Sequence, residues 1–134
     1  MSRLRVVAVD DSAVLRRLLV ETLETDPEVS VVAAALKRTT GLSSVIAQKP
    51  DVVILDIEMP GMNGLEALRE LRRLFPRLPI VMYSHLTDRG SRSTLEALCL
   101  GATDYVPKPP AGQGLEDARR HVRTVLLPRL KALH

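Results

Sequence analysis

Four short apolar runs in this sequence each end at a polar or charged residue that phosphoryl chemistry can use. They lead into Asp10 and Asp11, into Asp56, into Ser84 and, one residue further on, into Lys108. If the runs are neighbouring parallel strands, these groups meet at the carboxyl edge of one sheet, where open α/β sheets place their sites. Three carboxylates, one hydroxyl and one ammonium at one edge suit a divalent cation and a phosphoryl group.

The acidic residues at this edge predict a metal site and a nucleophile. Asp10, Asp11 and Asp56 would repel one another at short range, and a hard cation such as Mg²⁺ relieves that repulsion by binding carboxylate oxygens. With its neighbours screened, one carboxylate can attack a phosphoryl donor and form an acyl phosphate. We assign this role to Asp56, which stands alone at the end of the central strand. Lys108 and Ser84 are expected to bind phosphoryl oxygens.

The elements that must position these residues follow an alternating pattern. Short apolar runs alternate with longer segments of helical period, which is typical of repeated βα units around a mainly parallel sheet. The predicted strands are residues 4–9, 29–35, 52–56, 79–84 and 102–106. With right-handed crossovers and helices on both faces, the prediction is a doubly wound (βα)5 α/β fold with strand order 2-1-3-4-5. Its switch point lies between the strands that end at Asp10 and Asp56.

Five helices are predicted between and after these strands. The first is capped by Asp11-Ser12, buries a stripe of apolar residues, and ends at Asp26-Pro27. The second covers residues 41–48, and residues 59–64 before the third form a tight irregular loop. The last ends at Pro128. The residues predicted to be buried are Val14, Leu15, Leu18, Leu19 and Leu23 in the first helix, Leu65, Leu68, Leu71 and Phe75 in the third, Leu95, Leu98 and Cys99 in the fourth, and Leu115, Val122, Val125 and Leu126 in the fifth.

Composition limits the class of protein. The 134 residues suffice for one domain, and 46% hydrophobic with 26% charged residues indicate a folded globular chain. The net charge of +3 comes mainly from arginines on predicted helices without aromatic residues between them, which disfavours nucleic-acid binding. A single cysteine, no signal sequence and no apolar run near the length of a membrane span favour the cytoplasm.

The motifs resemble the receiver domain of two-component response regulators over residues 6–127. The matching segments are 9–12, 51–60, 62–64, Ser84, 101–102 and 105–109. The resemblance implies a flavodoxin-like receiver fold in which Asp56 accepts a phosphoryl group from the phosphohistidine of a histidine kinase. It implies that Asp10, Asp11, Asp56 and the backbone carbonyl of Glu58 bind Mg²⁺, and that Ser84 and Tyr105 reorient as a switch. It also implies a cis Lys108–Pro109 bond.

A closer resemblance is to the receiver portion of chemotaxis protein-glutamate methylesterases. It is carried by residues 10–19, 55–60, 84–90, 94–98 and 101–109, and residues 130–134 resemble the start of the interdomain linker. We therefore assign residues 1–127 to a receiver domain and 128–134 to the start of a C-terminal linker. The resemblance implies a chemotaxis-type kinase as donor. It also implies that the face of the fourth helix, fifth strand and fifth helix contacts a methylesterase catalytic domain or another effector.

Other functions remain open. A stand-alone chemotaxis-type regulator would use the same face to bind a separate partner. A small Mg²⁺-dependent aspartyl phosphatase would need the same Asp and Lys, with Glu58 as general acid, but the chain has no cap segment to recognise a substrate. A structural adaptor is disfavoured by the intact acidic set. For Tyr105, a half-buried strand tyrosine explains the pattern as well as a switch does.

The expected activity and assembly of the chain are limited. No serine nucleophile with partner His and Asp can be assembled, so no enzyme activity is expected beyond self-phosphorylation and self-dephosphorylation. His85, His121 and His134 lack metal-ligand spacing and are expected at the surface or at partner contacts. The protein is expected to be a monomer or a weak dimer that contacts neither nucleic acid nor a membrane.

Overall fold

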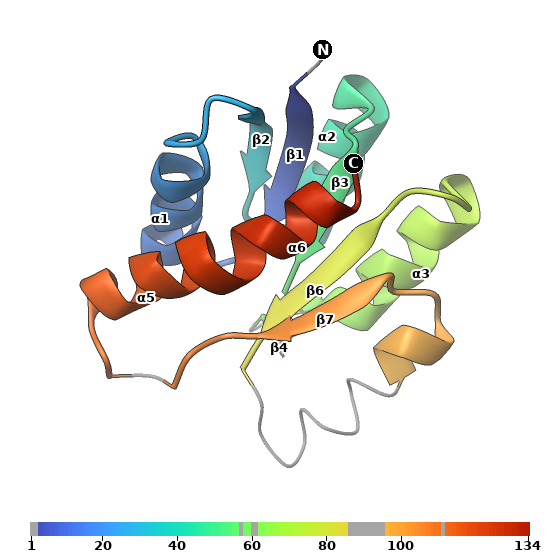
Figure 1. The fold of residues 1–134 in the computed structure, drawn as a ribbon. Helices are drawn as coiled ribbons and strands as arrows, with labels where there is room; N and C mark the ends of the chain where they lie inside the picture. The colour runs from blue at the N-terminus through green and yellow to red at the C-terminus, as the bar shows by residue number, and fades with distance from the viewer. Residues whose placement is uncertain (1–2, 57, 60–61, 86–95, 111) are drawn as a thin grey trace.

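A five-stranded parallel sheet forms the centre of the fold. The computed structural model describes residues 3–56, 58–59, 62–85, 96–110 and 112–134 (Figure 1). The strands lie in the order β2-β1-β3-β6-β7, and every neighbouring pair is parallel. In chain order these are the five predicted strands, so the order 2-1-3-4-5 is confirmed. Their bounds are β1 (Leu4–Val9), β2 (Val29–Ala35), β3 (Val52–Leu55), β6 (Ile80–Ser84) and β7 (Asp104–Pro107).

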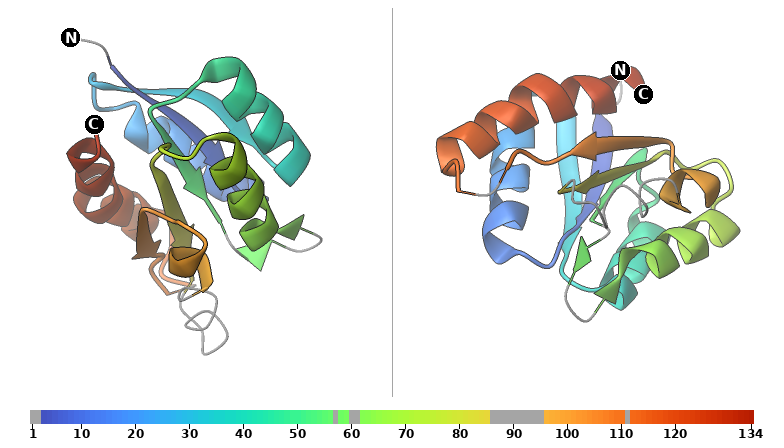
Figure 2. Two further views of the ribbon diagram at one scale, coloured as in Figure 1. Left: turned by 90° about the vertical axis from the view of Figure 1, so that its right-hand side faces the viewer. Right: turned by 90° about the horizontal axis from the view of Figure 1, so that it is seen from below.

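Helices cover both faces of this sheet (Figure 2). One face carries α1 (Ala13–Leu23) and the C-terminal run of α5 (Leu115–His121), η1 (Val122–Leu126) and α6 (Leu127–Ala132). The other face carries α2 (Arg38–Gln48), α3 (Gly64–Leu74) and a helical segment over residues 96–99. All four residues of β3 are buried, as expected for a central strand apolar on both faces. Two separate core clusters result, one on each side of the sheet.

The predicted helices form, but their ends are less buried than their periodicity suggested. Ser12 caps α1, because its side chain accepts a hydrogen bond from the backbone N–H of Leu15 at 3.3 Å. The predicted burial of Val14 and Leu115 is wrong: Val14 is 59% and Leu115 50% exposed. Both residues lie at helix starts, Val14 as the second residue of α1 and Leu115 as the first of α5.

The fourth predicted helix turns a different side chain toward the core. Ala97 is fully buried against the α3 side of the sheet, whereas Leu98 is 46% exposed and Cys99 is exposed, so the predicted burial of Leu98 and Cys99 is wrong. With about 100° between successive helical residues, an inward Ala97 turns the next two side chains outward. Leu95 lies outside the described residues.

The second helix begins earlier than predicted, at Arg38 rather than Gly41. Gly41 lies in its first turn, and a Cβ at this position would lie 2.9 Å from a Val9 methyl carbon. The glycine therefore lets α2 approach β1 closely. A two-stranded antiparallel sheet of β4 (Glu58–Met59) and β5 (Met62–Asn63) occupies the segment predicted as an irregular loop.

The last helix was predicted to end at Pro128, and this prediction is wrong, because the helix continues to Ala132. The N–H of Leu127 bonds to the carbonyl of Val122, five residues back, so η1 is a π-helical turn directly before the proline. Pro128 then lies in the first turn of α6, where its missing N–H is tolerated and the widened turn makes room for its ring. Leu130 follows and is fully buried in the core. The division of the chain at residue 127 stays a prediction.

The described part of the chain contains no helix long and apolar enough to cross a membrane.

Candidate functional site

The register of the two central strands brings Asp10 and Asp56 together. Val9 pairs with Leu55 at the ends of β1 and β3, and the next residue on each strand is the aspartate. The backbone N–H of Asp56 donates to the carbonyl of Val9 at 3.1 Å, which extends the ladder to the site. Both side chains are buried, with exposures of 3% for Asp10 and 6% for Asp56. Parallel pairing thus places two buried carboxylates side by side.

Lys108 bridges these two carboxylates. Its Nζ donates to Oδ2 of Asp10 at 2.8 Å and to Oδ2 of Asp56 at 3.0 Å. Burial alone would lower the pKa of Lys108, but the charges of Asp56 and Asp10 outweigh it and hold the pKa above its ordinary value. The ammonium therefore stays charged and fixes the spacing of the two acids.

Ser84 completes the contacts of Asp56. Its Oγ donates to Oδ1 of Asp56 at 2.6 Å, the carboxylate oxygen that Lys108 does not contact. The carbonyl of Ser84 accepts the backbone N–H of Lys108 at 2.8 Å, so β6 and the end of β7 hold the two donors together. The described structure contains no cis peptide bond, so the Lys108–Pro109 bond is trans and the expected cis form is wrong. In this trans geometry Lys108 already reaches both acids.

The three aspartates meet the expectation of a cation site. Asp10, Asp11 and Asp56 each bring a carboxylate oxygen within 4.8 Å of the others. Burial, followed by the negative charges of Asp10 and Asp56, raises the pKa of Asp11. A divalent cation bound there would remove this repulsion, and carboxylate oxygens are its preferred ligands. The donor set therefore fits Mg²⁺.

Two further predicted residues lie near this edge. Glu58 begins β4 two residues after Asp56, which is the position expected of a backbone carbonyl ligand. Tyr105 lies on β7 and pairs with Met82 of β6, and its ring packs against the core on the α3 side. The Tyr105 hydroxyl is buried and has no hydrogen-bond partner among the described residues. That unpaired hydroxyl is compatible with a residue that changes its contacts.

The structure adds residues that the sequence did not single out. Arg16 donates from Nη1 to the carbonyl of Asp10 at 2.8 Å and so connects α1 to the site. Tyr83, next to Ser84 on β6, forms a 2.9 Å hydrogen bond with Nδ1 of His121. Its ring centroid lies 5.6 Å from Nζ of Lys108. In the sequence, only its position next to Ser84 marked Tyr83 as a residue near the site. Its partner His121 is 38 residues away, so the sequence did not indicate their contact.

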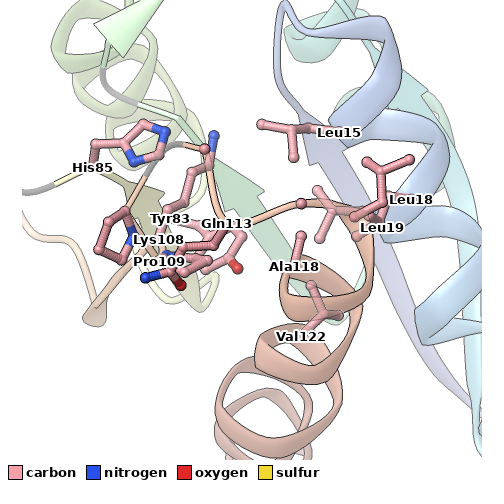
Figure 3. Close-up of a pocket in the computed structure, with 14 residues that line it drawn as sticks. Leu15, Leu18, Leu19, Tyr83, His85, Lys108, Pro109, Gln113, Ala118 and Val122 are labelled. Atoms are coloured by element: carbon pink, nitrogen blue, oxygen red, sulfur yellow. The ribbon is translucent and has the colours of Figure 1, made fainter.

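A pocket of about 380 Å³ lies beside the site, between α1 and the start of α5 (Figure 3). Leucines of α1 form one wall, Ala118 and Val122 another, and Lys108 and Tyr83 the wall toward the site. The pocket is mostly apolar. The ammonium of Lys108 therefore contacts the carboxylates of Asp10 and Asp56, while its aliphatic stem lines the pocket.

The chain matches the family model described as the response regulator receiver domain over residues 6–120. It belongs to the response regulator receiver domain family. This receiver domain is 44% identical over 133 residues to a protein-glutamate methylesterase/protein-glutamine glutaminase of a Nocardioides species, covering 99% of the chain and 36% of that relative. It is 50% identical over 107 residues to a second such protein of Vibrio vulnificus, covering 80% of the chain and 31% of the relative.

The structural comparison agrees with the sequence comparison. The receiver domain superposes on the crystal structure of the response regulator domain of Thermotoga maritima CheB with a TM-score of 0.85 and 37% identity. That match covers 98% of this chain and 96% of the other. The receiver domain is thus homologous to the regulatory domain of CheB and has a two-component receiver role. It spans about a third of the length of the methylesterase relatives.

Proposed function

We propose that Asp56 is the residue of this receiver domain that accepts the phosphoryl group. The observation that carries the proposal is the pair of donors on its carboxylate: Ser84 on Oδ1 and Lys108 on Oδ2, both buried. A phosphoryl group added to Asp56 keeps negatively charged oxygens between the same donors, which are charged or strongly polar. Asp10 shares the ammonium, but within the described part of the chain no hydroxyl donates to it, and its Oδ1 accepts the backbone N–H of Ser12.

The proposed reaction is a transfer from a phosphohistidine to a carboxylate. An oxygen of Asp56 attacks the phosphorus, the phosphorus–nitrogen bond of the donor breaks, and the histidine leaves with its electron pair and takes up a proton. The product is an acyl phosphate on Asp56. Lys108 neutralises the oxygens of the transferring group, and Ser84 donates to one of them.

Mg²⁺ is the proposed cofactor, held by the carboxylates of Asp10, Asp11 and Asp56 and by the backbone carbonyl of Glu58. When bound, it supplies positive charge that stabilises the transferring group. The fit rests on the 4.8 Å cluster of three carboxylates, whose formal charge exceeds that of the single ammonium of Lys108.

The proposed donor is a chemotaxis-type histidine kinase, and the proposed output is control of a methylesterase catalytic domain. The donor is supported by the match to the response regulator receiver domain, and the output by the relatives, which are protein-glutamate methylesterases. The output face would comprise the fourth predicted helix, of which the structure describes residues 96–99, together with β7 and α5. Residues 86–95 lie outside the described residues. Ser84 and Tyr105 would act as the switch, and the 46% exposure of Leu98 gives this face an apolar contact point. A stand-alone regulator with the same face is the second candidate.

The test is the intact mass of the protein after incubation with Mg²⁺ and acetyl phosphate. The wild type is expected to gain one phosphoryl group only when Mg²⁺ is present, and Asp56→Asn is expected to gain none. Asp117→Asn is the matched control, because Asp117 is a surface carboxylate of α5 paired with Arg120. An adduct that persists in Asp56→Asn would refute the assignment, and catalytic turnover of an external phosphomonoester would favour the aspartyl phosphatase instead.

A further inference from the structure

Tyr83 is a buried tyrosine directly behind the site. It is 4% exposed, and its pKa is raised, first by burial and then by the negative charge of Asp10. The hydroxyl therefore keeps its proton. Burial also lowers the pKa of His121, so that its ring is neutral and Nδ1 can accept. The 2.9 Å contact between the Tyr83 hydroxyl and Nδ1 of His121 is a hydrogen bond, and its direction is set by which ring nitrogen carries the histidine proton.

The same tyrosine ring lies against the ammonium of Lys108. Nζ is 5.6 Å from the ring centroid, within the distance at which a cation is attracted to an aromatic face. The rings of Tyr83 and His121 stack, with centroids 5.8 Å apart and an interplanar angle of 26°. His121 is the last residue of α5. The Tyr83 ring is therefore held by its own strand, β6, and by its contact with α5.

Lys108 needs such support, because its own backbone does not fix its ammonium. The stem of Lys108 lines the apolar pocket beside the site (Figure 3). The ion pairs with Asp10 and Asp56 hold the ammonium only while both carboxylates keep their positions. An aromatic face anchored by a hydrogen bond supplies a further contact for the ammonium.

We propose that Tyr83, anchored by its hydrogen bond to His121, is a positioning residue that holds the Lys108 ammonium between Asp10 and Asp56. The proposal rests on the proposed function, because the position of Lys108 affects activity only if a phosphoryl group is transferred at Asp56. It also makes the end of α5 a part of the site, since a shift of His121 displaces the ring that supports Lys108.

The first test is the rate of phosphorylation by acetyl phosphate, measured at a temperature at which every variant is folded. Tyr83→Phe keeps the ring and removes the hydroxyl, and is expected to slow the reaction about twofold to tenfold, the factor that one hydrogen bond supplies. His121→Phe should do the same from the other side of the bond, and His121→Gln, which keeps an acceptor, should recover part of the loss. Thr22→Val is the control: it removes another buried hydroxyl, with no described partner, on α1 away from Lys108.

A double-mutant cycle separates positioning from a general structural role. In a Lys108→Ala background, Tyr83→Phe is expected to change the remaining rate less than twofold, because the residue it positions is gone. An equal loss with and without Lys108 would overturn the proposal, and so would a wild-type rate in Tyr83→Phe.

A second measurement does not depend on phosphorylation. The ¹³Cε resonance of Lys108 in protein with labelled lysine reports the surroundings of its ammonium, and both Tyr83→Phe and His121→Phe are expected to shift or broaden it. Thr22→Val should leave it unchanged. An unchanged resonance in the first two variants would overturn the proposal. Absence of any phosphoryl adduct on the wild type, together with the expected shifts, would instead reject the proposed function and leave the positioning contact in place.

Discussion

Replacing Lys108 by methionine tests the charge balance of the site. Methionine keeps an unbranched stem of similar length and removes the ammonium. Lys108, Asp10 and Asp56 are each less than a tenth exposed, and the ion pairs are 2.8 and 3.0 Å long. Removing one partner of a buried ion pair costs about 3–5 kcal/mol, because the remaining charge stays buried without compensation. Since both pairs share one ammonium, we expect a single loss of about this size at pH 7 without Mg²⁺.

The assay is urea unfolding at neutral pH, with and without Mg²⁺. We expect added Mg²⁺ to recover part of the loss, because a cation binding the three carboxylates of the folded state replaces the missing charge. Lys131→Met is the matched control: Lys131 also contacts two carboxylates, those of Asp26 and Glu28, but at the surface. Its effect should be much smaller. A loss below about 1 kcal/mol for Lys108→Met, the range of surface ion pairs, would refute the reasoning that this ammonium is an essential buried counter-charge.

Two further predictions concern regions away from the site. Leu130→Ala should lower the free energy of unfolding by about 2–5 kcal/mol in urea titrations, because Leu130 is fully buried; a change under about 0.5 kcal/mol would favour a linker at this position. The hydrogen bond from the Glu28 N–H, followed by the contact with Lys131, lowers the pKa of Asp26. The ionised Asp26 carboxylate therefore stabilises the fold above its unfolded-state pKa, and this stabilisation is lost as the pH falls through its folded-state pKa. Wild type should therefore exceed Asp26→Asn in melting temperature at pH 6, and the difference should vanish in strong acid; a constant difference would contradict this.

The site was predictable because it depends on strand ends. Asp10, Asp56, Ser84 and Lys108 each follow an apolar run, and parallel pairing brings the ends of neighbouring strands to one edge. The sequence therefore predicted which residues meet. It did not predict that Ser84 already contacts Asp56, because rotamers depend on packing that no local pattern specifies.

Other features were missed because they depend on tertiary packing. Helical periodicity marked Val14 as buried, but periodicity does not tell which turns of a helix pack against the core, and Val14 is 59% exposed. A proline usually ends a helix, yet a π turn before Pro128 lets the chain continue. Tyr83 and His121 are each ordinary in the sequence, and only the packing of α5 on the sheet brings them together.

The continuous run from α5 to α6 carries the chain from one edge of the sheet to the other (Figure 1). Leu115 begins this run at the edge that carries Asp56, and Ala132 ends it at the opposite edge (Figure 1). At the far end, Lys131 contacts Asp26 and Glu28 before β2, and Nε2 of His134 lies 3.8 Å from Asp51 before β3. A fluorophore or affinity tag joined at His134 would therefore sit at the opposite pole from Asp56. Such a fusion should leave access of small phosphoryl donors to the acidic edge unobstructed.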